Sequence, residues 1–273
     1  MSMEKYSVLM SVYYKEKASY FSEAISSMID QTIKPDEIVI VKDGPLTEEL
    51  DKVINQFDSE YPGLFKIITN EQNIGLGLSL QKGILACSNQ LIARMDSDDI
   101  SRKDRIEKQL ALFRKNPDLD ICGGHIQEFS EKGLLGIRSV PLSNDDIYAY
   151  IKRRCPFNHM TVMYKKDAVV KAGNYQHFLY NEDYKLWIDM YLNQCKMANV
   201  DDILVDVRVD ENLYKRRGGS VYFKSEKAIQ DILLKKKMIN YFEYLYNVGI
   251  RFVLQILCPN SLRSLIFRLF ARS

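Results

Sequence analysis

The sequence predicts an α/β fold: a mostly parallel central sheet with helices on both faces, followed by a helical C-terminal tail. Short β-forming runs alternate with amphipathic helical segments over residues 6–95, and such alternation requires crossovers between parallel strands. Polar and acidic residues directly follow several of these runs, as ligand-binding groups do at the carboxyl ends of parallel strands. After Tyr222 the composition becomes helical and basic, which predicts the tail.

The elements of the N-terminal half follow from periodicity and residue type. Residues 6–12 are rich in β-formers, which indicates a buried strand. In residues 20–31 one face holds Phe21, Ala24, Ile25 and Met28, which indicates an amphipathic helix. By the same criteria the next elements are strand 38–41, helix 48–61, strand 65–69, helix 79–87, strand 91–95 and helix 102–115.

The second half mixes strands and helices and is predicted to complete a pocket over the sheet. We expect strands at 121–129, 137–140, 160–164, 196–200 and 204–209, with helices at 145–153 and 183–193. No repeat, low-complexity segment or Pro/Gly-rich linker interrupts this half. Residues 1–220 are therefore predicted as one domain, and residues 221–273 as a basic helical extension.

Three carboxylates crowd into the turn after strand 91–95. Asp96, Asp98 and Asp99 follow apolar residues, and hard divalent cations such as Mg²⁺ and Mn²⁺ bind carboxylate oxygens together with substrate phosphates. The turn is therefore a candidate site for a metal-bound diphosphate. A solvated loop that caps the next helix through Asp99 or Ser101 is equally consistent with this pattern.

The turns after the other strands offer further candidates. The first glycine is Gly44, so neither a dinucleotide-binding glycine loop nor a P-loop can follow the first strand. Asp43 can accept a hydrogen bond from a ring nitrogen of a base, and it also opens an Asp-Gly-Pro turn. Asn73 and Gly75 lie in a segment with two glycines, which would let the backbone approach a ligand closely.

A second acidic pair, Glu182 and Asp183, precedes an apolar helical pattern. Asp183 can act there as a general base toward a sugar hydroxyl, or serve only as a first-turn acid favoured by the helix dipole. His159 is a candidate contact of the acceptor or of a phosphate, with a hydrogen-bonded structural role as the alternative. Arg216 and Arg217 can close over a diphosphate and neutralise it, or belong to a solvated linker.

Charge and cysteine usage limit the compartment and the partners. The net charge is +2, but residues 213–273 hold twelve Lys/Arg and three Asp/Glu, which leaves −7 on the remainder. This basic segment suggests an anionic surface as its partner. Five cysteines without a Cys-x-x-Cys pair argue against a zinc site or a disulfide framework. The N-terminus lacks a secretory-signal pattern, and no apolar run approaches the about 20 residues that span a bilayer, so a cytoplasmic location is expected.

The C-terminal segment has an amphipathic pattern. If residues 261–272 form a helix, Ser264, Arg268 and Arg272 share one face and apolar side chains share the other. Together with residues 250–257 this predicts an interfacial helix on anionic lipid, at the inner face of the cytoplasmic membrane. A helix packed on the domain, or a homodimer contact, is the alternative.

These motifs together resemble those of the family 2 inverting glycosyltransferases with the GT-A fold. The resemblance is strongest to bacterial enzymes of O-antigen, capsule or exopolysaccharide assembly, of the amylovoran type, and it covers nearly the whole chain. The segments that carry it are 11–13, 31–32 with 35–47, 73–76, 93–100 with Arg105, 182–184 with 186–187, and 213–219.

The resemblance implies a set of site residues. Asp43 would read the uracil of a UDP-sugar, and Asp183 would be the catalytic base. Asp96 and Asp98 would hold Mn²⁺ or Mg²⁺ as an Asp-x-Asp pair, with Asp98 the more direct ligand. The other candidate substrate contacts are Ser11, Tyr13, Asn73, Gly75, Lys82, Asp96, Ser97, His159, Glu182, Trp187, Arg216 and Arg217.

The implied reaction is metal-dependent transfer of a hexose from UDP-glucose or UDP-galactose to a saccharide linked to undecaprenyl diphosphate, with inversion. Gln81 stands where relatives often have Asn, which leaves one ribose or sugar contact open. Trp187 is the single tryptophan, so the Gln-x-x-Arg-Trp motif of processive synthases is absent and one sugar per acceptor is implied. The alternatives are a nucleotidyltransferase, disfavoured by the glycine-free first turn, and an inactive nucleotide-sugar-binding or membrane-scaffold protein. No nucleic-acid partner is expected.

Overall fold

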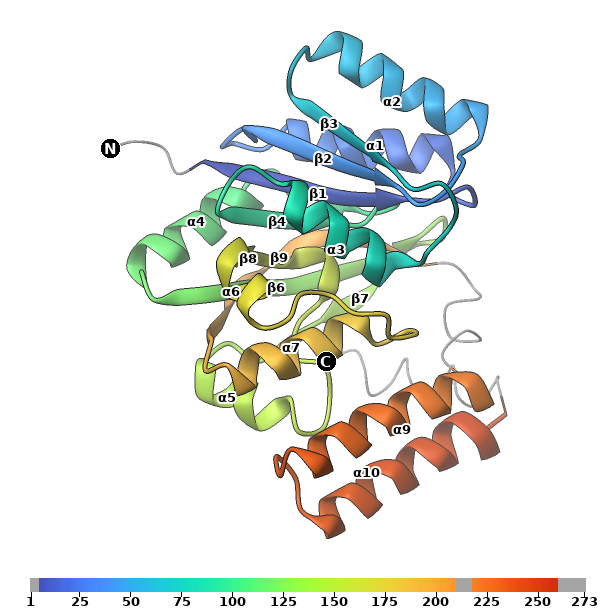
Figure 1. Ribbon diagram of the computed structural model, residues 1–273, viewed down its shortest axis with the longest axis vertical. Helices are drawn as coiled ribbons and strands as arrows, with labels where there is room; N and C mark the ends of the chain where they lie inside the picture. The colour runs from blue at the N-terminus through green and yellow to red at the C-terminus, as the bar shows by residue number, and fades with distance from the viewer. Residues whose placement is uncertain (1–4, 210–217, 260–273) are drawn as a thin grey trace.

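The structure, a computed structural model, describes residues 5–209 and 218–259 (Figure 1). Its N-terminal half alternates strands and helices in the predicted way. The strands are β1 Tyr6–Val12, β2 Glu37–Lys42, β3 Phe65–Thr69 and β4 Leu91–Met95. The helices between them are α1 Ala18–Ile29, α2 Glu48–Glu60 and α3 Leu76–Ala86.

The second half extends the same sheet and adds helices around it. Its strands are β5 Ile100–Ser101, β6 Leu119–Ser130, β7 Gly133–Arg138, β8 Met163–Lys165 and β9 Lys196–Arg208. Its helices are α4 Arg105–Lys115, α5 Asn144–Tyr150, α6 Lys166–Lys171, α7 Glu182–Leu192, α9 Ser220–Lys235 and α10 Tyr241–Phe252. A 3₁₀ turn, η1 His159–Thr161, precedes β8, and a π-helical turn, η2 Val253–Leu257, follows α10.

Within the described residues the strands form one nine-stranded sheet in the order β3-β2-β1-β4-β8-β6-β9-β5, with β7 paired to β6. β1 runs parallel to both β2 and β4, with Val12 opposite Lys42 and Met10 opposite Met95. The backbone N–H of Asp43 donates to the carbonyl oxygen of Val12 at 2.8 Å. The turns after β1, β2 and β4 therefore lie at one edge of the sheet, as the sequence predicts.

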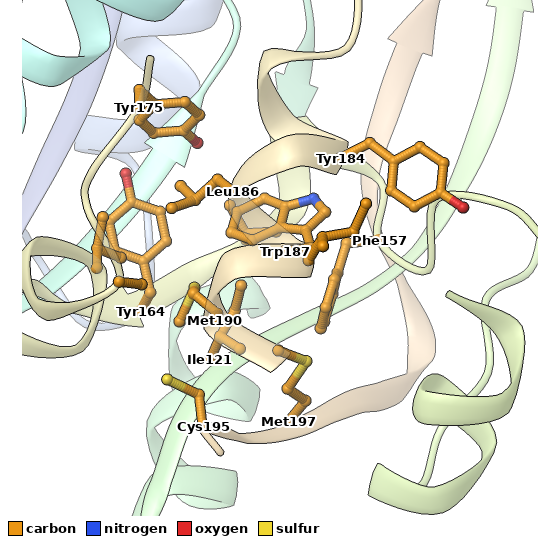
Figure 2. Packing of buried hydrophobic residues seen from close by; sticks show 14 of the residues in the cluster. Ile121, Phe157, Tyr164, Tyr175, Tyr184, Leu186, Trp187, Met190, Cys195 and Met197 are labelled. Atoms are coloured by element: carbon orange, nitrogen blue, oxygen red, sulfur yellow. The ribbon is translucent and has the colours of Figure 1, made fainter. Parts of the chain in front are cut away.

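Helices cover both faces of the sheet, and successive strand residues point to opposite cores. Leu9 packs in the core that includes α3, α7 and α9, whereas Val8 and Met10 pack in the core that includes α1, α2 and α4. Figure 2 shows the first core around Trp187, which lies among Phe157 and other aromatic and aliphatic side chains. Both cores are what a parallel sheet needs, because its strands are buried on both sides.

The α9–α10 hairpin lies at the end of the molecule farthest from β3, with α10 outermost (Figure 1). Ile229 and Leu233 of α9 belong to the same core as Trp187. None of the helices in the described ranges combines the length and hydropathy that crossing a bilayer requires.

Several element boundaries differ from the predicted ones for identifiable reasons. α3 begins at Leu76, three residues early, because Gly75 adopts φ +89° and its carbonyl accepts the N–H of Ser79. The two strands predicted over 196–209 form the single strand β9, which stays paired to β6 through register shifts beside His125.

The capping alternative for the acidic turn is wrong. α4 begins at Arg105, after the predicted residue 102. Ser101 lies in the short strand β5, and the Asp99 carboxylate accepts the backbone N–H of Arg208 at 2.9 Å instead of capping α4. The acidic turn is thus fixed by a strand from the second half of the chain.

Candidate active site

The turn that follows β1 lies against the acidic turn that follows β4. The hydroxyl of Ser97 donates to Glu16 at 2.8 Å, which joins the two turns directly. Tyr13, at the end of β1, is 38% exposed, and Ser11 is partly exposed. Ser11, Tyr13 and Ser97, all predicted substrate contacts, therefore come from adjacent strand ends.

The acidic turn is held from both sides by arginines. The guanidinium of Arg94, at the end of β4, donates to Asp96. Arg208, at the end of β9, donates from its backbone to Asp99 and from Nε to the carbonyl oxygen of Asp98 at 3.1 Å. Its guanidinium lies 3.8 Å from the ring centroid of Tyr20, a cation–π contact that fixes the side chain.

The acidic turn carries more negative charge than its neighbours neutralise. Burial, together with the carboxylates of Asp96 and Glu16, raises the pKa of Asp98 to about 7. Burial and the charges of Asp98 and Asp96 raise the pKa of Asp99 well above its ordinary value. Carboxylate oxygens are hard ligands, and their uncompensated negative charge would favour a divalent cation here. In the described part of the chain, no three His, Cys, Asp or Glu side chains converge in a metal-binding group, so Asp96 and Asp98 would hold a cation with ligands from outside the protein.

Asp43 organises the turn between β3 and α3. Its carboxylate accepts the backbone N–H groups of Ile74 and Gly75 at 2.8 and 3.1 Å. Asn70 donates to the same carboxylate at 3.3 Å and accepts Lys82 Nζ at 2.8 Å. The amide of Asn73 donates to the carbonyl oxygen of Asp43 at 3.3 Å. The predicted contacts Asp43, Asn73, Gly75 and Lys82 thus form one connected group.

The starts of α3 and α7 touch each other. A Cβ on Gly77 would lie 2.8 Å from the carbonyl oxygen of Gln176 and 3.1 Å from Cβ of Glu182, so only glycine permits this approach. Gln81, the residue that departs from the family pattern, donates to the carbonyl oxygen of Tyr175 at 2.7 Å. Residues 73–81 therefore pack directly on the segment that leads into the second acidic pair.

Asp183 lies in the first turn of α7 and is partly exposed. Its Oδ1 accepts the backbone N–H of Tyr184 at 2.7 Å, and the Cys155 thiol lies 3.5 Å from Oδ2. Burial raises the pKa of Asp183, while these two hydrogen bonds lower it. Burial and the charge of Asp183 raise the pKa of Glu182 to about 7. A carboxylate with a raised pKa is a stronger base than an ordinary aspartate.

Arg94 joins the two acidic groups electrostatically. Burial raises the pKa of Asp98, Glu182 and Asp183, and the positive charge of Arg94 lowers all three. Asp96 in turn raises the pKa of Glu182. Arg94 is 1% exposed, and its Nε and Nη1 have no hydrogen-bond acceptor among the described residues. The charge of one buried guanidinium therefore acts on both acidic groups, which makes them one candidate site.

The remaining predicted contacts lie at different depths. His159 is partly exposed, and its Nε2 lies 2.7 Å from the hydroxyl of Tyr175. Burial and Arg94 lower the pKa of His159 well below its ordinary value, so the ring is neutral. Trp187 is fully buried against Phe157 (Figure 2), which gives it a supporting place in the core. Arg216 and Arg217 lie outside the described residues.

Four residues with clear contacts in the site were given no role by the sequence reasoning: Arg94, Glu16, Cys155 and Arg208. Arg94 follows an apolar run, which suggests a buried position. A charged residue there needs an oppositely charged partner, and this requirement was a usable signal. The contacts of Arg208 and Cys155 join residues 110 and 28 positions apart, and no local pattern predicts them.

Comparison with known families and proteins gives consistent matches. Residues 7–175 match the family model described as "Glycosyl transferase family 2". The chain is 38% identical over 236 residues to the amylovoran biosynthesis glycosyltransferase AmsE of Erwinia amylovora. The alignment covers 86% of this chain and 88% of that protein. It is 37% identical over 268 residues to the UDP-Gal:alpha-D-GlcNAc-diphosphoundecaprenol beta-1,3-galactosyltransferase of Escherichia coli, covering 97% and 95% of the two chains.

Solved structures match the fold at low sequence identity. Residues 1–349 of S. aureus TarS in complex with UDP-GlcNAc superpose with a TM-score of 0.67 at 18% identity, covering 91% of this chain and 72% of that one. The mannosyltransferase PcManGT of Pyrobaculum calidifontis, in complex with GDP-Man and Mn²⁺, gives 0.65 at 11% identity and covers 100% and 77%. These likenesses confirm the predicted GT-A fold.

Proposed function

Because the chain belongs to glycosyl transferase family 2, we propose that it transfers one hexose from a UDP-sugar to a hydroxyl of a lipid-linked saccharide, with inversion at the anomeric carbon. One observation carries the proposal. The guanidinium of Arg94 donates to Asp96 of the acidic turn, and its positive charge lowers the pKa of both Asp98 and Asp183. That arrangement supports a diphosphate site with a base beside it.

The donor is assigned from the residues around Asp43. A carboxylate offers about four acceptor positions, and Asp43 uses three of them for Ile74, Gly75 and Asn70. One position remains for the imide N–H of uracil. The E. coli relative is named for a UDP-Gal donor, which supports UDP-galactose as the proposed donor here, with UDP-glucose as the alternative.

Asp96 and Asp98 are the proposed ligands of Mn²⁺ or Mg²⁺. A divalent cation at these oxygens would act as a Lewis acid toward the diphosphate, a contribution worth several kcal/mol. Arg94 keeps Asp96 oriented, and Arg208 holds the carbonyl oxygen of Asp98 and the carboxylate of Asp99. Arg216 and Arg217 are proposed to add positive charge near the diphosphate and to help keep water from the sugar.

Asp183 is the proposed base. It accepts the proton of the acceptor hydroxyl while that oxygen bonds to the anomeric carbon, on the face opposite UDP. The bond between the anomeric carbon and the diphosphate oxygen breaks, and UDP leaves with the electron pair. A single displacement of this kind inverts the anomeric configuration. The raised pKa of Asp183, caused by burial, strengthens it for this step.

The acceptor and the setting are inferred from the relatives. The names of two of them refer to amylovoran biosynthesis and to a diphosphoundecaprenol-linked GlcNAc acceptor. We therefore place this protein in bacterial polysaccharide assembly, with O-antigen, capsule and exopolysaccharide as the candidate products. Its acceptor would be presented at the inner face of the cytoplasmic membrane.

Asp183→Asn tests the base. Transfer should fall roughly 10²- to 10⁴-fold, while UDP-sugar binding measured by calorimetry is retained. The control is Asp189→Asn on the same helix, whose carboxylate pairs with Lys185 and should matter little for transfer. Transfer by Asp183→Asn at the wild-type rate would refute the assignment. Acceptor-dependent release of UDP from a panel of UDP-sugars, with and without EDTA, separates this function from a nucleotidyltransferase or an inactive binding protein.

A further inference from the structure

α10 and η2 have their polar side chains turned inward. Asn247 and Gln255 are 5% and 6% exposed. Asn247 donates to Gln230 at 2.9 Å, and Arg251 pairs with Glu226 at 2.6 Å. A helix that faces water shows the opposite arrangement, with its polar face outward and its apolar face on the core.

The outward side of this segment is apolar. We call it the outer face. It consists of Tyr241, Phe242, Leu245, Tyr246, Ile250, Phe252, Val253, Ile256 and Leu257, all exposed. Phe242, at 82% exposed, is almost as accessible as in an extended chain. Single exposed apolar residues are ordinary, but a row of them on consecutive helical turns marks an interaction surface.

Basic residues flank the outer face. Lys235, which ends α9, and Lys236 and Lys237, in the turn that leads into α10, are exposed. The one acid between residues 241 and 259 is Glu243, which is occupied in capping α10 through the N–H of Asn240 at 2.8 Å. The sequence of residues 260–273 adds three arginines and no acid. Aromatic and aliphatic side chains beside clustered lysines match the chemistry of an anionic lipid surface.

We propose that the outer face docks the α9–α10 hairpin on the surface of an anionic lipid bilayer. The aromatic rings and aliphatic side chains enter the boundary between head groups and acyl chains, and the lysines stay at the phosphates. In a symmetric contact, the outer face of a second copy would bring the same lysines and no complementary charge, so lipid is the better occupant.

The docking surface is connected to the site. Asn181, the residue that precedes α7, donates to the Ser225 hydroxyl of α9 at 2.8 Å. Asn247 and Arg251 of α10 donate to the carbonyl oxygens of Lys152 and Arg153, in the segment that leads to Cys155. Docking would therefore hold α7, which carries the proposed base Asp183, at a fixed height above the lipid. The inference itself rests on the outer face and not on the proposed reaction, so an inactive protein would still bind.

Vesicle flotation of the full chain tests the proposal. The vesicles are equal parts phosphatidylglycerol and phosphatidylcholine, compared with phosphatidylcholine alone. We expect Phe242→Glu to weaken binding to the anionic vesicles about tenfold or more. Leu134→Glu is the matched control, because Leu134 is 76% exposed on β7, away from the hairpin, and should leave binding unchanged. Circular dichroism checks that both variants fold.

Charge and competing occupants are tested in the same assay. Replacing the three lysines at 235–237 by glutamine should weaken binding to anionic vesicles about fivefold per lysine, converting roughly 1 kcal/mol for each at 1.4 kcal/mol per tenfold. A chain ending at Pro259 should still depend on Phe242. The proposal is overturned if the wild-type chain does not float, or if Phe242→Glu and Leu134→Glu float alike. It is also overturned if light scattering shows a dimer that Phe242→Glu dissociates, or if removing residues 260–273 abolishes binding that Phe242→Glu leaves intact.

Discussion

Replacing Gly77 by alanine tests whether the contact between α3 and α7 sets the position of the base. The added Cβ would lie 2.8 Å from the carbonyl oxygen of Gln176 and 3.1 Å from Cβ of Glu182. The first of these neighbours is backbone and cannot rotate away. The segment that carries Glu182 and Asp183 must therefore shift relative to α3.

The expected cost is small for stability and large for catalysis. Overpacking costs about 1–3 kcal/mol, and alanine regains about 1 kcal/mol of helix propensity, which leaves a net loss of about 0–2 kcal/mol. For a chain of this size that lowers Tm by at most about 8 °C. A displacement of the base on the order of 1 Å can reduce turnover about 100-fold.

The assay is acceptor-dependent UDP release together with thermal unfolding. Gly249→Ala is the control, because Gly249 is also helical and its Cβ would meet no atom within 4 Å. That change should stabilise the protein by about 0.5–1 kcal/mol and leave turnover unchanged. Wild-type kcat and KM in Gly77→Ala would show that the contact does not position the base.

Substitutions at three further positions test the site. Arg94→Met should abolish most transfer with little change in Tm. Losing one partner of the buried ion pair with Asp96 costs about 3–5 kcal/mol, but the change also removes two buried N–H groups without acceptors, each of which costs about 1–3 kcal/mol. A large fall in Tm would contradict this balance. Cys155→Ala removes a hydrogen bond that lowers the pKa of Asp183, so the pKa of Asp183 should rise and kcat should be lost at a higher pH on acidification. Cys155→Ser should retain the wild-type pH profile. Identical pH profiles for the wild type and both variants would exclude the contact. Asp43→Ala leaves the backbone amides of Ile74 and Gly75 without their acceptor, which should cost roughly 3 kcal/mol of unfolding free energy. UDP binding measured by calorimetry should also weaken. Unchanged UDP affinity would show that Asp43 does not contact the donor.

The first half of the fold follows closely from the sequence. β1, β3 and β4 occupy the expected residues, because each is a short β-forming run bounded by turn residues. The second half was harder to predict, since its strands pair across long separations. β5 is too short to leave a pattern, and β9 continues through the polar residues Asp201 and Asp202 only because β6 lies beside it.

The candidate site shows the same contrast between what local sequence patterns predict and what only tertiary contacts reveal. Asp96, Asp98 and Asp183 stand out in the sequence because acidic residues cluster at the end of an apolar run or before one. Their neutralising and orienting partners do not stand out, because Arg94 resembles part of a strand and Arg208 reaches the acidic turn from β9. Local patterns reveal the reactive groups, whereas the groups that set their pKa values and orientation depend on tertiary contacts.

The shared core of the catalytic half and the α9–α10 hairpin bears on how the protein can be shortened for laboratory work. Ile229, Leu233, Met238 and Ile239 pack in the cluster that contains Trp187. A fragment ending at residue 220 would leave that cluster open to water, and open apolar surface promotes aggregation. It would also remove Ser225, which accepts the amide of Asn181. Fragments for crystallisation or for ligand screening therefore need to extend at least to Pro259.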